Sequence, residues 1–121
     1  MREVVLDTET TGLNPDDGDR IVEIGCVELL NHLPTGEEFH TYINPDMPMP
    51  DGAFKIHGLS DDFLQDKPNI VDVLDSFLDF LDRSTLVIHN ADFDLKFLRR
   101  EIRVAGSSRE LKNKVVDTLS E

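Results

Sequence analysis

The chain has 121 residues, of which 39% are hydrophobic and 31% are charged. This composition is typical of a single globular domain with one hydrophobic core, and it excludes disordered and fibrous classes of protein. No apolar run approaches the roughly 20 residues that a membrane-spanning helix needs, so we expect no membrane association. The net charge of −13 argues against a protein that binds nucleic acid through basic residues alone. The negative charge does not exclude a metal-dependent nuclease. In such an enzyme, divalent cations lie between the protein carboxylates and the substrate phosphate, and their charge dominates the local electric field.

The distribution of cysteine and of basic residues narrows these classes further. Cys26 is the only cysteine, which rules out an internal disulfide, fits a reducing cytoplasm and predicts a small packing residue. The chain leads from Met1 straight into a strand pattern, so we expect no signal peptide. Basic residues concentrate in the last quarter of the chain: Lys96, Arg99, Arg100, Arg103, Arg109, Lys112 and Lys114. Such a cluster is usually a solvated face, and a DNA-facing edge is the alternative.

Hydrophobic periodicity and turn residues predict the elements. In chain order they are strands at 4–8, 21–30 and 37–43, a short helix at 61–65, a long helix at 70–81, a strand at 86–88, a second long helix at 92–105 and a strand that begins at 115. Runs of Val, Ile and Leu predict the strands, and apolar residues at helical spacing predict the long helices. A turn is expected at 31–36, and three prolines exclude regular structure at 44–50. Ser60 is a suitable N-cap for the short helix.

The order of these elements predicts the fold class. Three strands joined by short turns, followed by helix, strand, helix and strand, indicate an α/β domain with a mixed five-stranded sheet. The first three strands should be antiparallel, and the later strands, reached through helices, should be parallel to the first. Helices normally cover both faces of such a sheet. Nothing follows the fifth strand to cover one face, so we expect a single domain, residues 1–121, that is truncated and lacks its C-terminal helices.

Two groups of acids mark a candidate metal site. Asp7 and Glu9 point to the same side of a strand, roughly 6.5 Å apart along the chain. Two such carboxylates repel unless a cation lies between them, and a hard divalent ion prefers oxygen ligands. Asp92 and Asp94 follow the fourth predicted strand and begin a helix, so they would face Asp7 and Glu9 if the first and fourth strands are parallel neighbours. The ordinary alternative is that these are strand-end and helix-terminus acids, and one of Asp92 and Asp94 is expected to be only that.

An ordered series of motifs carries a resemblance to a known family. The motifs are Asp7-Thr8-Glu9-Thr10-Thr11-Gly12-Leu13, His57-Gly58-Leu59, His89-Asn90-Ala91 with Phe93-Asp94, and Val116-Asp117-Thr118-Leu119. In this order and at this approximate spacing they resemble the DEDDh 3′→5′ exonucleases, and among them the proofreading (epsilon) subunits of bacterial DNA polymerase III. The resemblance covers essentially the whole chain.

The resemblance implies an RNase H-like fold and a two-metal mechanism with Mg²⁺ or Mn²⁺ that releases 5′-mononucleotides from a DNA 3′ end. It implies that Asp7, Glu9 and Asp94 are catalytic metal ligands, whereas Asp92 does not match a ligand. It implies that the substrate-binding residues are Thr8, Thr10, Thr11, His57 and Asn90. We place His57 in a loop bounded by glycines and expect Asn90 also to cap the helix that it precedes. Asp117 is expected to be structural.

The resemblance also implies partners and a bacterial, cytoplasmic location. In the family, the alpha subunit of the polymerase binds a tail that follows the exonuclease domain and that this chain lacks. Gly52 stands where many relatives carry an acid, which leaves that substrate contact in doubt.

A second departure from the family concerns the general base. The family's last motif, a His with an Asp five residues later, supplies the base and the fourth ligand. Every histidine here lies before Asp94: His32, His40, His57 and His89. We therefore expect no general base in this chain. Loss of a positioned base costs about 10²–10⁴-fold in rate, so activity should be weak or absent.

Two alternatives remain open. The first is a non-catalytic remnant, possibly a homodimer that covers the bare sheet face, which binds nucleotide or metal weakly. The second is a DEDDh ribonuclease that trims RNA.

Overall fold

The computed structural model describes residues 1–119. Its elements are β1 (Arg2–Thr10), a 3-10 helix η1 (Pro15–Asp17), β2 (Ile21–Leu30), β3 (Leu33–Tyr42), α1 (Asp51–His57), α2 (Asp61–Leu64), α3 (Ile70–Leu81), β4 (Thr85–Ile88), α4 (Ala91–Val104) and β5 (Val115–Asp117). The strands form a five-stranded sheet in the order β3-β2-β1-β4-β5. β1 is antiparallel to β2, and β2 to β3, whereas β4 is parallel to β1 and β5 is parallel to β4. The predicted mixed α/β sheet is confirmed.

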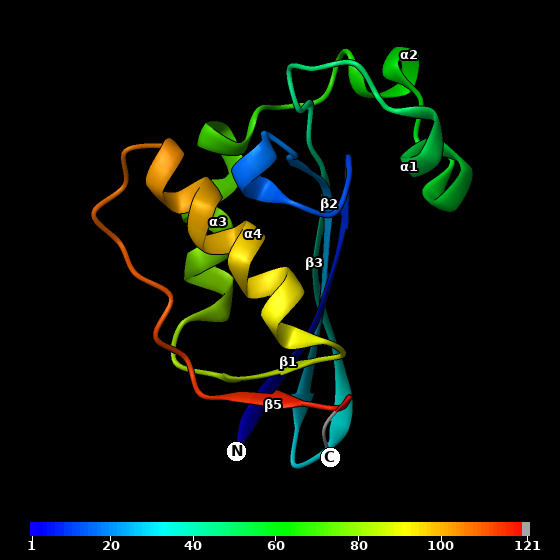
Figure 1. Ribbon diagram of the computed structural model, residues 1–121. Helices are drawn as coiled ribbons and strands as arrows, with labels where there is room; N and C mark the ends of the chain where they lie inside the picture. The colour runs from blue at the N-terminus through cyan, green and yellow to red at the C-terminus, as the bar shows by residue number, and fades with distance from the viewer. Residues whose placement is uncertain (120–121) are drawn as a thin grey trace.

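Within residues 1–119, helices cover one face of the sheet. α3 and α4 lie together on that face, with α3 against β3 and α4 against β2, β4 and β5 (Figure 1). Side chains alternate along β1 accordingly, since Val4 and Leu6 are buried while the intervening Val5 is 39% exposed. Val27 on β2 is exposed in the same way. The second face of the sheet therefore has no helix over it in the described part of the chain.

Aromatic side chains fill the core between the sheet and the two long helices. Phe77 of α3 and Phe97 of α4 are fully buried. Phe39 of β3 packs against α3, with its ring centroid 5.8 Å from that of Phe77 and 6.0 Å from that of Phe80. Cys26 is also buried in this core, and burial raises the pKa of its thiol to about 12. The predicted role of Cys26 as a packing residue is confirmed.

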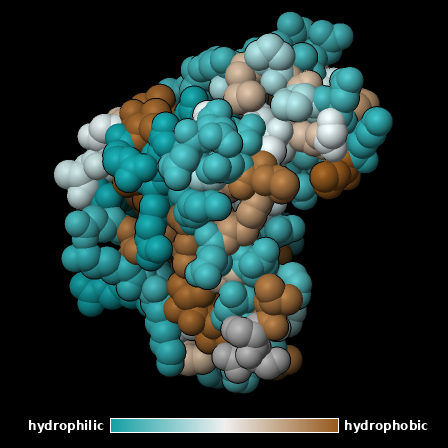
Figure 2. Space-filling view, in the orientation of Figure 1, coloured by the Kyte–Doolittle hydropathy of each residue, from teal (hydrophilic) through white to brown (hydrophobic). Residues whose placement is uncertain are grey.

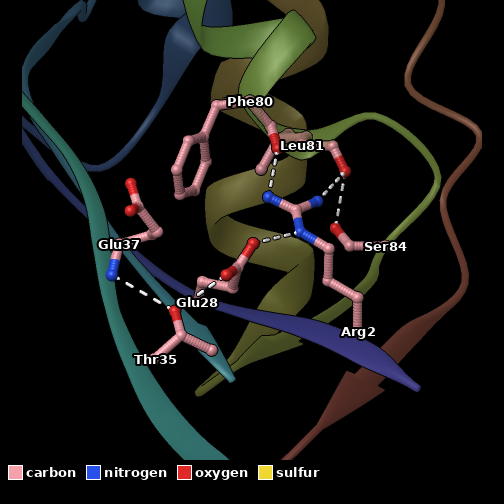
Figure 3. A network of polar contacts seen from close by, with 7 residues as sticks. All are labelled: Arg2, Glu28, Thr35, Glu37, Phe80, Leu81 and Ser84. Atoms are coloured by element: carbon pink, nitrogen blue, oxygen red, sulfur yellow. Dashed lines mark hydrogen bonds and ion pairs between the residues drawn. The ribbon is translucent and has the colours of Figure 1, made fainter. Parts of the chain in front are cut away.

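Arg2 ties the start of β1 to the end of α3 (Figure 3). Its guanidinium donates to the main-chain oxygens of Phe80 (2.6 Å) and Leu81 (3.1 Å), which lie in the last turn of the helix. Its Nε donates to Glu28 on β2, whose other carboxylate oxygen accepts from the hydroxyl of Thr35 on β3. These two hydrogen bonds lower the pKa of Glu28, and the bond from Arg2 has the larger effect. One side chain thus joins the central strand of the sheet to the helical layer that covers it.

The turn before β3 was predicted too long. It consists of Asn31 and His32, which both have positive φ (53° and 69°), as a two-residue hairpin turn requires. β3 begins at Leu33, whereas the sequence predicted residue 37. The prediction was wrong because Pro34 and Gly36 indicate a turn. β3 is an edge strand, where a missing N–H is tolerated, and Pro34 pairs opposite Leu29.

α1 is the helix that the sequence did not predict. It covers Asp51–His57, and Gly58 ends it in the left-handed region with φ 71°. His57 is therefore the last residue of a helix rather than part of a loop. The prolines before residue 51 and Gly52 in the first turn concealed this helix. No helix in residues 1–119 combines the length and hydrophobicity needed to cross a membrane.

Candidate metal and nucleotide site

The candidate acids lie where β1 and α4 meet. β4 runs parallel to β1, with Val5 opposite Val87, so α4 begins beside the end of β1. Asp94, in the first turn of α4, is buried (4% exposed) and accepts a 2.6 Å hydrogen bond from the hydroxyl of Thr8. Thr8 lies on β1 between the two other candidate ligands. The expected proximity of Asp94 to this strand end is thus confirmed.

Burial and neighbouring negative charge raise the pKa of Glu9 and of Asp94. The pKa of Asp94 rises to about 6, mainly through burial and further through the charges of Asp7 and Glu9, although the Thr8 hydroxyl opposes the shift. Burial and then Asp7 raise the pKa of Glu9, and His57 opposes that shift. Asp7, Glu9 and Asp94 therefore form one cluster of negative charge.

The chemistry of this cluster fits a divalent ion. Carboxylate oxygens are the preferred ligands of Mg²⁺ and similar hard cations, and a cation between them would remove the mutual repulsion. Among residues 1–119, no three His, Cys, Asp or Glu side chains already form a metal cage. A bound ion would therefore have to draw Asp7, Glu9 and Asp94 together.

A cavity of about 450 Å³ adjoins the acids. It lies between the end of β1, the loop that follows it, and α1, and its lining is mostly apolar. Leu13, Ile56 and Phe93 contribute large apolar side chains, while Glu9 and His57 contribute polar groups. A mostly apolar pocket with a few polar groups, in this range of volume, is typical of small-ligand sites.

His57 is held in one orientation at this cavity. Its Nδ1 accepts from the main-chain N–H of Leu59 (3.0 Å), so the ring proton is assigned to Nε2. Nε2 then donates to the main-chain oxygen of Thr10 (3.0 Å). His57 therefore joins α1 to the end of β1, and both of its ring nitrogens are engaged.

The hydroxyls of the three threonines in the first motif all bind protein atoms. The hydroxyl of Thr8 binds Asp94, and that of Thr10 donates to the main-chain oxygen of Gly12 (2.6 Å). The hydroxyl of Thr11 donates to Asp19 (2.9 Å). Thr8, Thr10 and Thr11 all line the cavity. The hydrogen bonds of their hydroxyls to protein atoms fix the shape of this wall.

Comparison with known proteins identifies the family. Residues 4–120 match the sequence model of the family described as Exonuclease (RNase_T). The chain belongs to this exonuclease family. It is 55% identical to the DNA polymerase III subunit epsilon of Rickettsia conorii (strain Malish 7), over 98% of this chain and 53% of that protein. It is 44% identical to the subunit of the same name from Salmonella typhimurium (strain LT2), over 98% of this chain and 52% of that protein. The exonuclease chain thus spans about half the length of the curated relatives it matches.

Solved structures confirm the RNase H-like fold of this exonuclease chain. An apo structure of exonuclease I superposes with a TM-score of 0.85 at 20% identity, over 98% of this chain and 29% of that one. A structure of exonuclease X in complex with 5′ overhanging duplex DNA superposes with a TM-score of 0.73 at 27% identity, over 96% of this chain and 59% of that one.

Asp19 supports the first motif of the exonuclease chain and was missed in the sequence. Its carboxylate accepts from the hydroxyl of Thr11 and from the main-chain N–H of Asn14. A Cβ at Gly12 would lie 2.3 Å from an oxygen of Asp19, so only glycine fits there without a shift. No local signal marks Asp19, because its partners lie five to eight residues away across an irregular loop.

Asp117, rather than Asn90, caps α4. Asn90 occupies the N-cap position with left-handed φ and ψ of 63° and 58°, but its side chain makes no capping hydrogen bond. The two carboxylate oxygens of Asp117 instead accept from the main-chain N–H groups of Asn90 and Ala91, each at 3.0 Å. The expected side-chain cap by Asn90 is therefore wrong, and the structural role expected of Asp117 is confirmed. Hydrogen bonds from main-chain N–H groups lower the pKa of Asp117, and the bond from Leu119 has the largest effect.

Removal of this cap should loosen the turn that carries Asp94. We expect Asp117→Ala to lower the stability by about 0.5–2 kcal/mol, and with it the Tm, and to weaken Mn²⁺ binding, because the turn that carries Asp94 loses its two capping hydrogen bonds. Thermal unfolding with and without Mn²⁺ measures both effects. Asp92→Ala, an exposed acid in the same turn, is the matched control: it should leave the Mn²⁺ response unchanged and lower the Tm less than Asp117→Ala does, since it loses only its interaction with the helix dipole. An unchanged Tm and Mn²⁺ response in Asp117→Ala would contradict this role.

Proposed function

We propose that this chain carries the acidic centre of a proofreading-type 3′→5′ exonuclease that removes 5′-mononucleotides from a frayed or single-stranded DNA 3′ end. The observation that carries the proposal is the coupled cluster of Asp7, Glu9 and Asp94 beside an apolar cavity with a fixed histidine. The similarity to DNA polymerase III epsilon subunits supports DNA as the substrate.

The chain's own residues would bind and orient the substrate. Asp7, Glu9 and Asp94 would hold two divalent ions, either Mg²⁺ or Mn²⁺, which when bound supply charge for a phosphoryl transfer. The apolar side chains of the cavity would receive the terminal base and exclude water from it. His57 would contact the terminal nucleotide, because its ring is fixed at the cavity by Thr10.

The same structure predicts a slow reaction. His57 is the histidine at the cavity, but Nδ1 accepts from Leu59 and Nε2 donates to Thr10. Neither nitrogen is free to take a proton from an attacking water. We therefore propose a rate about 10²–10⁴-fold below that of an enzyme with a positioned base.

A non-catalytic protein is the second candidate function. The uncovered sheet face, with Val5 and Val27 exposed, favours an associated state, and the engagement of both ring nitrogens of His57 disfavours turnover. In this case the chain would bind nucleotide or metal weakly, possibly as a homodimer. Light scattering tests the dimer, which a monodisperse monomer would exclude.

The cellular setting follows from the relatives. Their name, a subunit of DNA polymerase III, supports a role in bacterial DNA replication. We propose a cytoplasmic location on this basis, and the alpha subunit of the polymerase as the partner of the longer protein.

A nuclease assay separates the candidates. The substrate is a 5′-labelled primer with a 3′ mismatch, incubated with Mn²⁺ and with the wild type, Asp7→Ala or the exposed control Asp72→Ala. We expect shortening by single nucleotides with the wild type and the control, and none with Asp7→Ala. Equal, negligible signals from all three would reject the enzyme and leave the non-catalytic candidate. A short RNA in the same assay tests the ribonuclease alternative, since faster cleavage of RNA would favour it.

A further inference from the structure

A line of basic side chains runs along the exposed side of α4. Lys96, Arg99 and Arg103 are exposed, and their spacing of three and four residues places them on one side of the helix. Asp94 and most of the apolar residues of α4 are buried on the other side. We call Lys96, Arg99 and Arg103 the α4 stripe.

The α4 stripe leads into a second cavity. This cavity, of about 690 Å³, lies at the C-terminal end of α4, where Arg99 and Arg103 meet Arg109 and Lys112 of the following segment. Glu110 is the one acid among its lining residues. Figure 2 shows strongly hydrophilic side chains over this half of α4. The cavity does not share lining residues with the cavity beside Asp94.

The α4 stripe stands out by its alignment of three cations on one helix, in a chain that has 25 acids and only 12 Lys and Arg residues. In such a protein, intramolecular acids are expected to neutralise most bases. Four of the five other arginines lie within 4.0 Å of a carboxylate, namely Arg2, Arg20, Arg100 and Arg109, whereas Arg83 has no such partner within residues 1–119. Within residues 1–119, Lys96 and Arg103 have no such partner, and Arg99 donates to the main-chain oxygen of Leu111 (3.2 Å).

Helix electrostatics account for only part of this pattern. Cations near a helix C-terminus interact favourably with the macrodipole, which suits Arg103 in the last turn. Lys96 lies in the N-terminal half of α4, where that interaction is absent. The alignment of three cations towards a basic cavity therefore requires another explanation.

We propose that the α4 stripe and its cavity bind the phosphate backbone of a nucleic-acid strand, several nucleotides away from the 3′ end in the active site. The inference rests on the proposed nuclease function. At 1.5 Å of rise per residue, Arg103 lies about 14 Å beyond Asp94 along the helix. The rise along the axis of B-form DNA is about 3.4 Å per nucleotide, so the stripe reaches at most about four nucleotides from the site. The surrounding negative charge would repel the strand elsewhere and so direct it to this helix.

Fluorescence anisotropy with a labelled 12-nucleotide single-stranded DNA tests the stripe. EDTA is present, so binding is measured without metal-dependent cleavage. K96Q/R103Q is compared with the matched double variant R83Q/K114Q, which removes the same charge from exposed positions elsewhere. We expect K96Q/R103Q to weaken binding for any DNA sequence. Its slope of log affinity against log salt should fall by about 1.4, or ~0.7 for each lost phosphate contact. R83Q/K114Q should behave as the wild type.

Three results would overturn the inference. They are equal affinity and salt slope for the two double variants, no detectable DNA binding by the wild type, and displacement of DNA by polyglutamate as effectively as by DNA of equal charge. The last result would indicate an acidic protein surface as the partner. Loss of binding in K96Q/R103Q together with no cleavage in Mn²⁺ would support the stripe and reject the nuclease function. Mn²⁺-dependent cleavage by the wild type together with unchanged DNA binding in K96Q/R103Q would support the nuclease function and reject the stripe as a DNA-binding surface.

Discussion

Asp94→Asn should raise the Tm of the metal-free protein and abolish the increase that Mn²⁺ gives to the wild type. Asparagine keeps the acceptor for the Thr8 hydroxyl but removes a buried charge that Asp7 and Glu9 oppose. The fold without metal should therefore become more stable. Mn²⁺ binding should weaken by about 100-fold or more, because loss of an outer-shell partner alone costs 10–100-fold or so. Thermal unfolding with and without Mn²⁺ measures both changes, which have opposite consequences for Tm.

The pH dependence of stability gives the same prediction a second test. The pKa of Asp94 is about 6 in the fold and 3.8 as a free side chain. The folded state therefore binds the proton more tightly than the unfolded state does. The resulting stabilisation is complete below pH 3.8 and is lost as the pH rises through about 6. In the metal-free protein, Asp94→Asn should remove this loss between pH 4 and 7.

The matched control is Asp92→Asn, an exposed acid in the same helical turn. It should leave the Mn²⁺ response and the pH dependence unchanged. If Asp94→Asn kept the wild-type increase in Tm with Mn²⁺, Asp94 would not be a metal ligand.

Glu101→Ala should lower the free energy of unfolding by about 1.5–3 kcal/mol, because it removes a buried charged acceptor from the partly exposed Arg20 and from the buried main-chain N–H of Ile21. Glu101 is 2% exposed and accepts from Nε of Arg20 (2.9 and 3.1 Å) and from the main-chain N–H of Ile21 (3.2 Å). It therefore joins α4 to the start of β2. Urea denaturation measures the effect.

Two further variants make this prediction specific. Glu110→Ala removes an exposed partner of Lys112 and should produce no measurable change. The double variant R20M/E101L replaces the ion pair with apolar side chains and should recover most of the lost stability. A Glu101→Ala protein within about 1 kcal/mol of the wild type would show that the pair does not hold the layers together.

Most of the fold could be predicted from local patterns. Apolar residues at helical spacing predicted the helix that forms α3, and the change from short turns to helical connections predicted the parallel strands β4 and β5. The errors occurred where tertiary context outweighs local preference. Pro34 lies in β3 because an edge strand tolerates it, and Gly52 lies in α1 despite its low helix propensity.

The candidate site was predictable only in part. Asp7, Glu9 and Asp94 stand in recognisable local motifs, and the sheet order brings these motifs together. Residues that support the site bind partners far away in the sequence, as Glu101 binds Arg20 and Asp117 binds the start of α4. Periodicity and spacing carry no information about such long-range hydrogen bonds. The N-terminal cap of α4 shows this most clearly, because the local pattern indicated Asn90 whereas the side chain of Asp117 supplies the hydrogen bonds.

Metal binding by the three acids is the central claim, and diffraction from crystals soaked in Mn²⁺ tests it most directly. Anomalous differences locate the ion without reference to activity. We predict a peak bounded by Asp7, Glu9 and Asp94, with carboxylate oxygens about 2–2.5 Å from it. No peak among these carboxylates at saturating Mn²⁺, with all three side chains in clear density, would contradict the account.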